Sequence, residues 1–231
     1  MSADKYTDRV RKLFAKAQST TSEHEAQAFL AKAYDLLAQH GIDETLARSG
    51  TADASEVGTW TFTPAGPYKY DQVYLVGVVA DALHCYAVKT PTGDVIIYGV
   101  KRHLDRVEML AGMLVGYMLA TAAKARPAIP SMPTVTYRKS VMAGFMAEVQ
   151  TRLRAAEKRA QHESGYSTGA EVVLASDEQR AREAMHAAHG RLTYGSSPRR
   201  SSEGFAAGKS AARSVDLGGG NRVGGRAAIA G

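Results

Sequence analysis

Residues 6–42 read YTDRVRKLFAKAQSTTSEHEAQAFLAKAYDLLAQHGI, and this stretch decides how the fold begins. On either side of the polar run 19–22, apolar side chains recur every three or four residues, which is the spacing of a helix with one apolar face. We therefore predict two helices, from about Asp4 to Gln18 and from Ser22 to His40, that bury their apolar faces as an antiparallel helical hairpin.

The ends of the second helix carry recognisable signals. Ser22 and Glu25 have the spacing of a capping box, in which each side chain accepts a hydrogen bond from the other residue's backbone N–H. Gly41 follows the last periodic residue, and glycine takes the left-handed conformation that commonly ends a helix. The sequence therefore predicts that the second helix stops at Gly41.

The remainder mixes short β-rich runs with longer helical patterns. Residues 84–89 and 94–100 flank a turn with proline and glycine, which predicts a β-hairpin. We predict an α+β fold that is mostly helical, with the hairpin packed on long helices. We expect four units: a helical hairpin (1–48), a linker (49–70), an α+β domain (71–189) and a basic glycine-rich tail (190–231). The linker is expected to contain an edge strand at 59–62, and the tail a short helix within 204–215. The α+β domain is expected to contain helices over 71–83, 104–124, 137–161 and 177–189 and a short strand at 172–174.

Two segments carry a family resemblance. The phrases VRKLFAKA at 10–17 and HEAQAFLAKAYDLLAQHGI at 24–42 resemble domain-of-unknown-function family 2786 in spacing, capping and terminal glycine. Leu37 and His40 depart from the methionine and the aromatic residue that are common there. The rest resembles a companion, family 7168, in its Trp60 strand, its cysteine-bearing hairpin and the FAAG phrase at 205–208. The resemblance implies a bacterial, including actinobacterial, or phage protein, but no activity.

Composition restricts the compartment. Cys85 is the only cysteine, so an intramolecular disulfide is impossible, and the N-terminus has no basic start followed by an apolar block. The longest uncharged run, Met109 to Ala123, is shorter than the roughly 20 residues that a membrane span needs. We expect a protein of the bacterial cytoplasm that does not enter the membrane.

Positive charge gathers in the tail. Residues 190–231 carry seven basic and two acidic side chains, whereas each of the segments 1–50 and 51–136 is balanced. Arginines spaced by glycine and serine suit contacts with phosphate, so the leading hypothesis is a non-enzymatic protein that binds DNA, RNA or nucleoprotein; a solubilising tail is the alternative. The predicted contacts are Arg199, Arg200, Arg213, Arg222 and Arg226, assisted by Arg9, Lys12 and Lys16 on the first helix.

The sequence contains only weak signs of a catalytic or metal-binding site. The β-hairpin brings His84 and Cys85 to the end where His103 follows, which is a weak candidate set for a catalytic metal. Neighbouring residues in a strand point to opposite faces, which argues against shared ligation. We expect neither a metal nor a cofactor, and a metal-dependent hydrolase-like enzyme is the second hypothesis.

A third hypothesis is a protein-interaction or oligomerisation module. Gly112, Gly116 and Ala120 place a small residue at every fourth position of the long apolar helix. In a soluble protein this spacing favours close packing of a buried helix against a neighbour, and a homodimer interface is the alternative.

Overall fold

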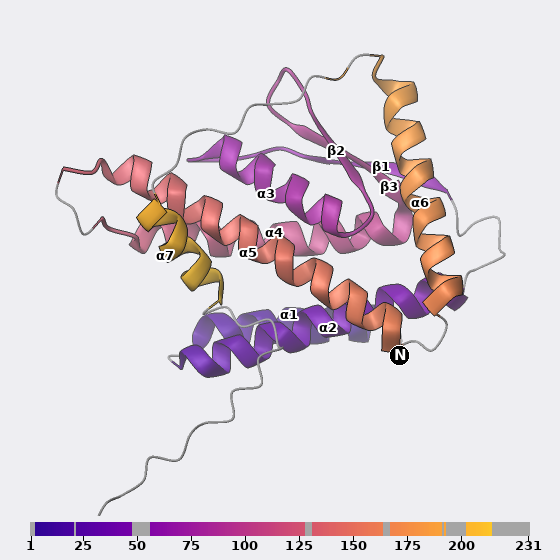
Figure 1. Cartoon of the computed structure of the whole chain (residues 1–231), viewed down its shortest axis with the longest axis horizontal. Helices are drawn as coiled ribbons and strands as arrows, with labels where there is room; N and C mark the ends of the chain where they lie inside the picture. Colours follow the sequence, from indigo (N-terminus) through magenta and orange to yellow (C-terminus); the bar gives the residue numbers. More distant parts are fainter. Residues whose placement is uncertain are drawn as a thin grey trace, which may run out of the picture.

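The computed structural model describes residues 3–20, 22–47, 56–127, 131–163, 167–190, 192 and 202–213. The fold is α+β and mostly helical, as predicted, with a small antiparallel sheet among the helices (Figure 1). The elements are α1 (Ala3–Ser19), α2 (Glu23–Ala47), β1 (Val57–Phe62), α3 (Lys69–Ala82), β2 (Tyr86–Lys89), β3 (Val95–Val100), α4 (Lys101–Lys124), α5 (Thr134–Glu163), α6 (Ser167–Ala188) and α7 (Ser202–Arg213).

Helices α1 and α2 pack along each other as the predicted hairpin. Val10 and Phe14 of α1 and Tyr34 of α2 are buried, and the rings of Phe14 and Tyr34 meet edge to face with centroids 5.6 Å apart. The capping prediction is confirmed on one side, because the Glu25 backbone N–H donates to Ser22 Oγ at 3.3 Å. The Glu25 carboxylate instead accepts a hydrogen bond from the Thr20 hydroxyl.

The predicted stop at Gly41 is wrong, since α2 continues to Ala47. Gly41 is needed for space and not for a left-handed turn: a Cβ atom there would lie 2.3 Å from Nη1 of Arg106 in α4. The glycine therefore lets a buried arginine approach the backbone of α2, and the hairpin is docked on α4 at this point.

The sheet has the order β1-β3-β2, with both pairs antiparallel. The predicted edge strand is confirmed and extends to Val57, with Trp60 opposite Ile97. Trp60 is half-buried against the core. Helices α3, α4 and α5 lie together beside the sheet (Figure 1), and one cluster of buried side chains runs from these helices into α1 and α2.

The predicted strand at 172–174 is wrong, and so is the predicted start of a helix at 177. Residues 167–188 form one helix, α6, because Leu174, Ala181 and Met185 recur at helical spacing and are buried. Asp177 lies on the same face and is 1% exposed. A short apolar run such as 172–174 does not distinguish a strand from a buried turn of helix.

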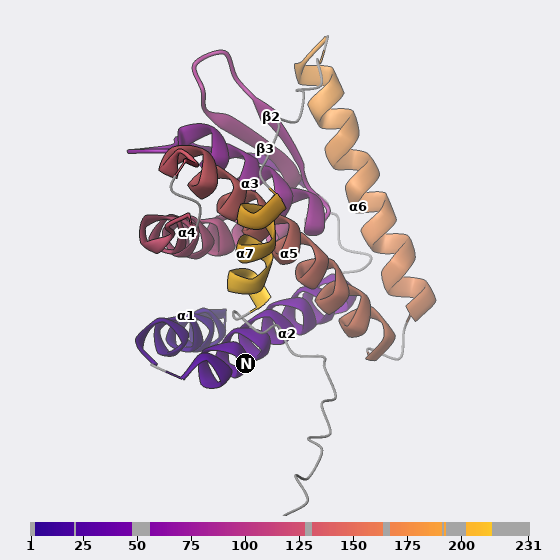
Figure 2. The ribbon, with the colours of Figure 1, turned by 60° about the vertical axis from the view of Figure 1, so that its left-hand side comes forward.

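Helix α7 packs across α5 (Figure 2) and agrees with the helix expected within 204–215. The two backbones approach closely through glycines: a Cβ atom on Gly208 would lie 1.9 Å from the carbonyl oxygen of Val141. At the far end of α7, the Arg152 guanidinium donates to the carbonyl of Ala212 at 2.8 Å. The glycine of the FAAG phrase therefore has a packing role.

Candidate nucleic-acid interface

Four of the five phosphate contacts predicted in the tail fall outside the described residues. The contacts outside the described residues are Arg199, Arg200, Arg222 and Arg226. The fifth, Arg213, is the last residue of α7. The three predicted residues of α1 are exposed: Lys12 pairs with Asp8 at 2.6 Å, Lys16 lies 5.5 Å from the Phe29 ring centre, and Arg9 lies on the same surface.

A second group of cations, which the sequence analysis did not single out, lies where α4 ends and α5 begins. Arg126 donates to the carbonyls of Ala123 and Ala125 at 2.9 and 3.0 Å. Arg138, a full turn into α5, donates to the same two carbonyls at 2.9 and 3.4 Å. Two guanidinium groups therefore converge on the C-terminus of α4, and Lys139 is exposed beside them. We call Arg126, Arg138 and Lys139 the cationic cluster.

The charge of this cluster is not balanced locally. No aspartate or glutamate occurs between Glu108 and Glu148 in the sequence. Among the described residues, none of the three cluster side chains forms an ion pair with a carboxylate. The backbone carbonyls that accept these hydrogen bonds offer only partial negative charge. This acid-free segment is the sequence signal that could have revealed the cluster.

The arrangement of the helices extends the positive surface. The end of α1, which carries Lys16, and α7, which carries Lys209, lie at the same end of the molecule as the cationic cluster (Figures 1 and 2). The Lys209 ammonium lies 5.9 Å from the Phe205 ring centre. Cations spread over several helices suit a long polyanion better than a small ligand.

Two of the three weak metal candidates lie close together, but the three do not form a ligand set. The rings of His84 and His103 have centroids 5.7 Å apart. His84 lies in the turn before β2 with a left-handed φ of 60°, and its Nδ1 faces a carboxylate oxygen of Glu178 at 3.7 Å. Cys85 is buried, and its thiol donates weakly to the Leu83 carbonyl. Within the described residues, no three His, Cys, Asp or Glu side chains are arranged to hold one metal ion.

The centre of this region is instead a buried ionic network that the sequence analysis missed. Asp177 of α6 accepts hydrogen bonds from Arg102, from Arg180 at 3.0 Å and from His103 Nε2 at 3.1 Å. One turn further along α4, Arg106 pairs with Glu157 of α5, and both side chains are buried. Arg102 and Arg106, one turn apart on α4, therefore connect α4 to α6 and to α5 through buried ion pairs.

Burial sets the protonation of this network. It lowers the pKa of His103 to about 4, although the hydrogen bond to Asp177 opposes the shift and the nearby charges of Arg106 and Arg102 reinforce it. Burial also raises the pKa of the Cys85 thiol to about 12, so the sulfur remains protonated and unreactive at neutral pH. These groups lack the solvent access that a catalytic centre needs.

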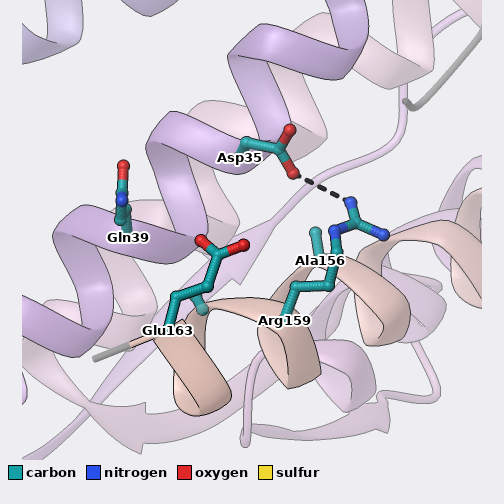
Figure 3. Close-up of a pocket in the computed structure, with 6 residues that line it drawn as sticks. Asp35, Gln39, Ala156, Arg159 and Glu163 are labelled. Atoms are coloured by element: carbon teal, nitrogen blue, oxygen red, sulfur yellow. Dashed lines mark hydrogen bonds and ion pairs between the residues drawn. The ribbon is translucent and has the colours of Figure 1, made fainter. Parts of the chain in front are cut away.

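A small cavity separates α2 from α5 (Figure 3). Its volume is about 90 Å³, and Asp35 and Arg159 form an ion pair of 2.8 Å at its wall. A drug-sized ligand or substrate needs a pocket of roughly 300 Å³ or more. This cavity therefore accommodates water and not a substrate.

The comparisons with known proteins bear on the hairpin. Residues 5–44 match the family described as "Protein of unknown function (DUF2786)". The match spans most of α1 and α2 and confirms that resemblance. No curated protein and no solved structure matches the chain. The resemblance of the remainder to family 7168 stays a prediction.

Proposed function

We propose that the protein binds nucleic acid through the cationic cluster and the positive surface around it. The observation that carries this proposal is the convergence of Arg126 and Arg138 on the end of α4, within 39 consecutive residues that contain no carboxylate. Like charges held together without a counter-ion raise the local potential and attract a polyanion. Guanidinium groups suit phosphate because they donate two hydrogen bonds in one plane.

The tail adds to this surface under the same proposal. Arg199 and Arg200 directly precede α7 in the sequence, and Arg213 ends it, so the predicted tail contacts flank a helix of the positive end. Lys16 and Lys209 supply further cations there. The family resemblances support a bacterial or phage origin, so that the ligand is DNA or RNA of the bacterial cytoplasm.

The enzyme hypothesis has less support. Of its residues, His103 lies in the buried network, where it and its partner Asp177 are 0% and 1% exposed, and Cys85 is also buried, whereas His84 is half-buried beside Glu178. A substrate cannot reach His103 or Cys85 in this structure, because both side chains are buried. Their geometry instead supports a structural role, in which Asp177 compensates buried positive charge.

Binding of fluorescently labelled single- and double-stranded oligonucleotides to the full chain tests the proposal. The variant Arg126→Glu/Lys139→Glu reverses two charges of the cationic cluster while Arg138 continues to cap α4. At low salt we expect at least about a tenfold loss of affinity, because reversed charges repel phosphate and counter-ions are no longer released.

The matched control reverses two exposed cations elsewhere, Lys32→Glu in α2 and Lys158→Glu in the last turns of α5. The net charge of both double variants is the same. Equal losses in the two variants would show a nonspecific charge effect, and undiminished binding by the cluster variant would refute the proposed site.

A further inference from the structure

Among the described residues, no element covers the outer face of α4, which is apolar. The structure contradicts the expected burial of Gly112, Gly116 and Ala120, because all three are exposed. Met109, Met113, Val115 and Leu119 flank them and are only half-buried. No charged side chain occurs from Met109 to Ala123. Figure 2 shows α4 at the margin of the molecule, with no other labelled element outside it.

Nothing within the described part of the chain explains the glycines of this face. A Cβ atom on Gly112 or Gly116 would meet no atom within 4 Å. Glycine in a helix interior costs about 1 kcal/mol relative to alanine. Gly41 and Gly208 instead make room for a close neighbour inside the protein. The glycines of α4 are thus suited to a close neighbour that the described residues do not supply.

The charges at the two ends of the face identify that neighbour. Glu108 and Lys124 are exposed and stand eight residues before and eight residues after Gly116 on the same ridge of the helix. Neither forms an ion pair among the described residues. If a two-fold axis passed between two copies at Gly116, Glu108 of each copy would lie opposite Lys124 of the other. Gly112 of each copy would likewise lie opposite Ala120 of the other.

We propose that two copies of this chain pair through α4 in antiparallel orientation, with the two-fold axis at Gly116. Small residues on the ridge allow the two helices to approach closely, and the half-buried methionines and Leu119 fill the sides of the contact. The face is self-complementary, which is the requirement for an isologous dimer interface. This pairing does not involve the cationic cluster. The clusters of the two copies would lie at opposite ends of the dimer, away from the two-fold axis.

A membrane is a less suitable partner for this face. α4 is the one described helix that is long and apolar enough to span a bilayer, but 39% of its apolar window is already buried in the protein. Its first turns hold Arg102 and Arg106 in buried ion pairs with α6 and α5. A second copy accounts for both the apolar middle and the opposite charges at the ends.

Analytical ultracentrifugation of the full chain, from low to high micromolar concentration, tests the pairing. We expect the wild-type protein to be a dimer in reversible equilibrium with the monomer. Glu108→Lys and Lys124→Glu should each weaken the dimer at least about tenfold, because each places like charges opposite each other. The double variant Glu108→Lys/Lys124→Glu restores opposite charges and should restore dimerisation.

Circular dichroism of each variant verifies that the helices remain folded, since both residues are exposed. Gly116→Leu gives a second test, because a bulky side chain on the axis meets itself and should produce a monomer. A wild-type monomer at every concentration, or a dimer that the single charge reversals and Gly116→Leu leave intact, overturns the proposal. Binding of lipid vesicles by the wild-type monomer would assign the face to a membrane instead.

Discussion

At the scale of single residues, the buried charges are the most consequential feature. Asp177 compensates Arg102 and hydrogen-bonds His103 in a site that water does not reach. Asp177→Asn leaves that arginine without a counter-charge, which typically destabilises a protein by about 3–5 kcal/mol. Urea unfolding measures the effect. The control is Asp81→Asn, which removes an exposed partner of Arg154 and should cost about 1 kcal/mol or less. Similar losses in both variants would contradict the account.

The depressed pKa of His103 predicts a pH dependence of stability. Above pH 6.5 the imidazole is neutral in both states. As the pH falls, the unfolded chain binds a proton near pH 6.5, whereas the folded protein does so only near pH 4. Stability therefore falls through this window, by about 2 kcal/mol between pH 7 and pH 5. Chemical denaturation at several pH values measures the slope. His103→Gln, which can still donate to Asp177, should flatten it, and an unchanged slope would contradict the assignment.

Gly41 offers a third test at this scale. Gly41→Ala drives a methyl group into the Arg106 guanidinium and should destabilise the protein by about 1–3 kcal/mol. Gly77→Ala in α3 is the matched control, since its Cβ atom would meet only Ala87 at 3.8 Å. That control should be neutral or stabilising by up to about 1 kcal/mol. Thermal unfolding compares the two, and a stabilised Gly41→Ala would contradict the close approach.

At the scale of elements, α7 is held to α5 by backbone proximity. Gly208→Val places a branched side chain against the Val141 carbonyl and should displace α7 without unfolding the core. Hydrogen exchange should then rise sharply in 202–213 and little in α3 and α4. Ala206→Val changes an exposed position of the same helix and serves as the control. Protection of α7 that survives Gly208→Val would show that the contact is not what holds it.

Periodicity and capping predicted the elements that depend on local pattern. α1, the β-hairpin, α3, α4 and α5 agree with their predicted positions within a few residues, whereas α2 extends seven residues beyond its predicted end and α6 begins ten residues before its predicted start. The errors arose where tertiary contacts decide. Gly41 continues a helix because of Arg106, and Asp177 lies in the middle of a helix because two cations surround it. Arg106 is far from Gly41 in sequence and Arg102 is far from Asp177, so no local pattern could reveal these two contacts. The cationic cluster likewise joins a residue of the loop after α4 to two residues of α5.

At the scale of the whole molecule, charge and apolar surface are separated. The cationic cluster lies at one end, the buried network fastens α5 and α6 to α4, and the apolar face of α4 lies along the margin. This separation allows one surface to bind a polyanion while another binds a second copy. In the proposed dimer, the two cationic clusters lie far apart and contact separate stretches of nucleic acid.

The salt dependence of nucleic-acid affinity is the most direct test of the central claim. For a duplex ligand, the logarithm of the association constant should fall linearly with the logarithm of salt concentration, by about 0.9 for each phosphate neutralised. The account predicts that neutralising two cluster residues, with Arg126→Gln/Lys139→Gln, makes this slope shallower by about two and that Lys32→Gln/Lys158→Gln leaves it unchanged. Equal slopes for the wild-type protein and the cluster variant would contradict it.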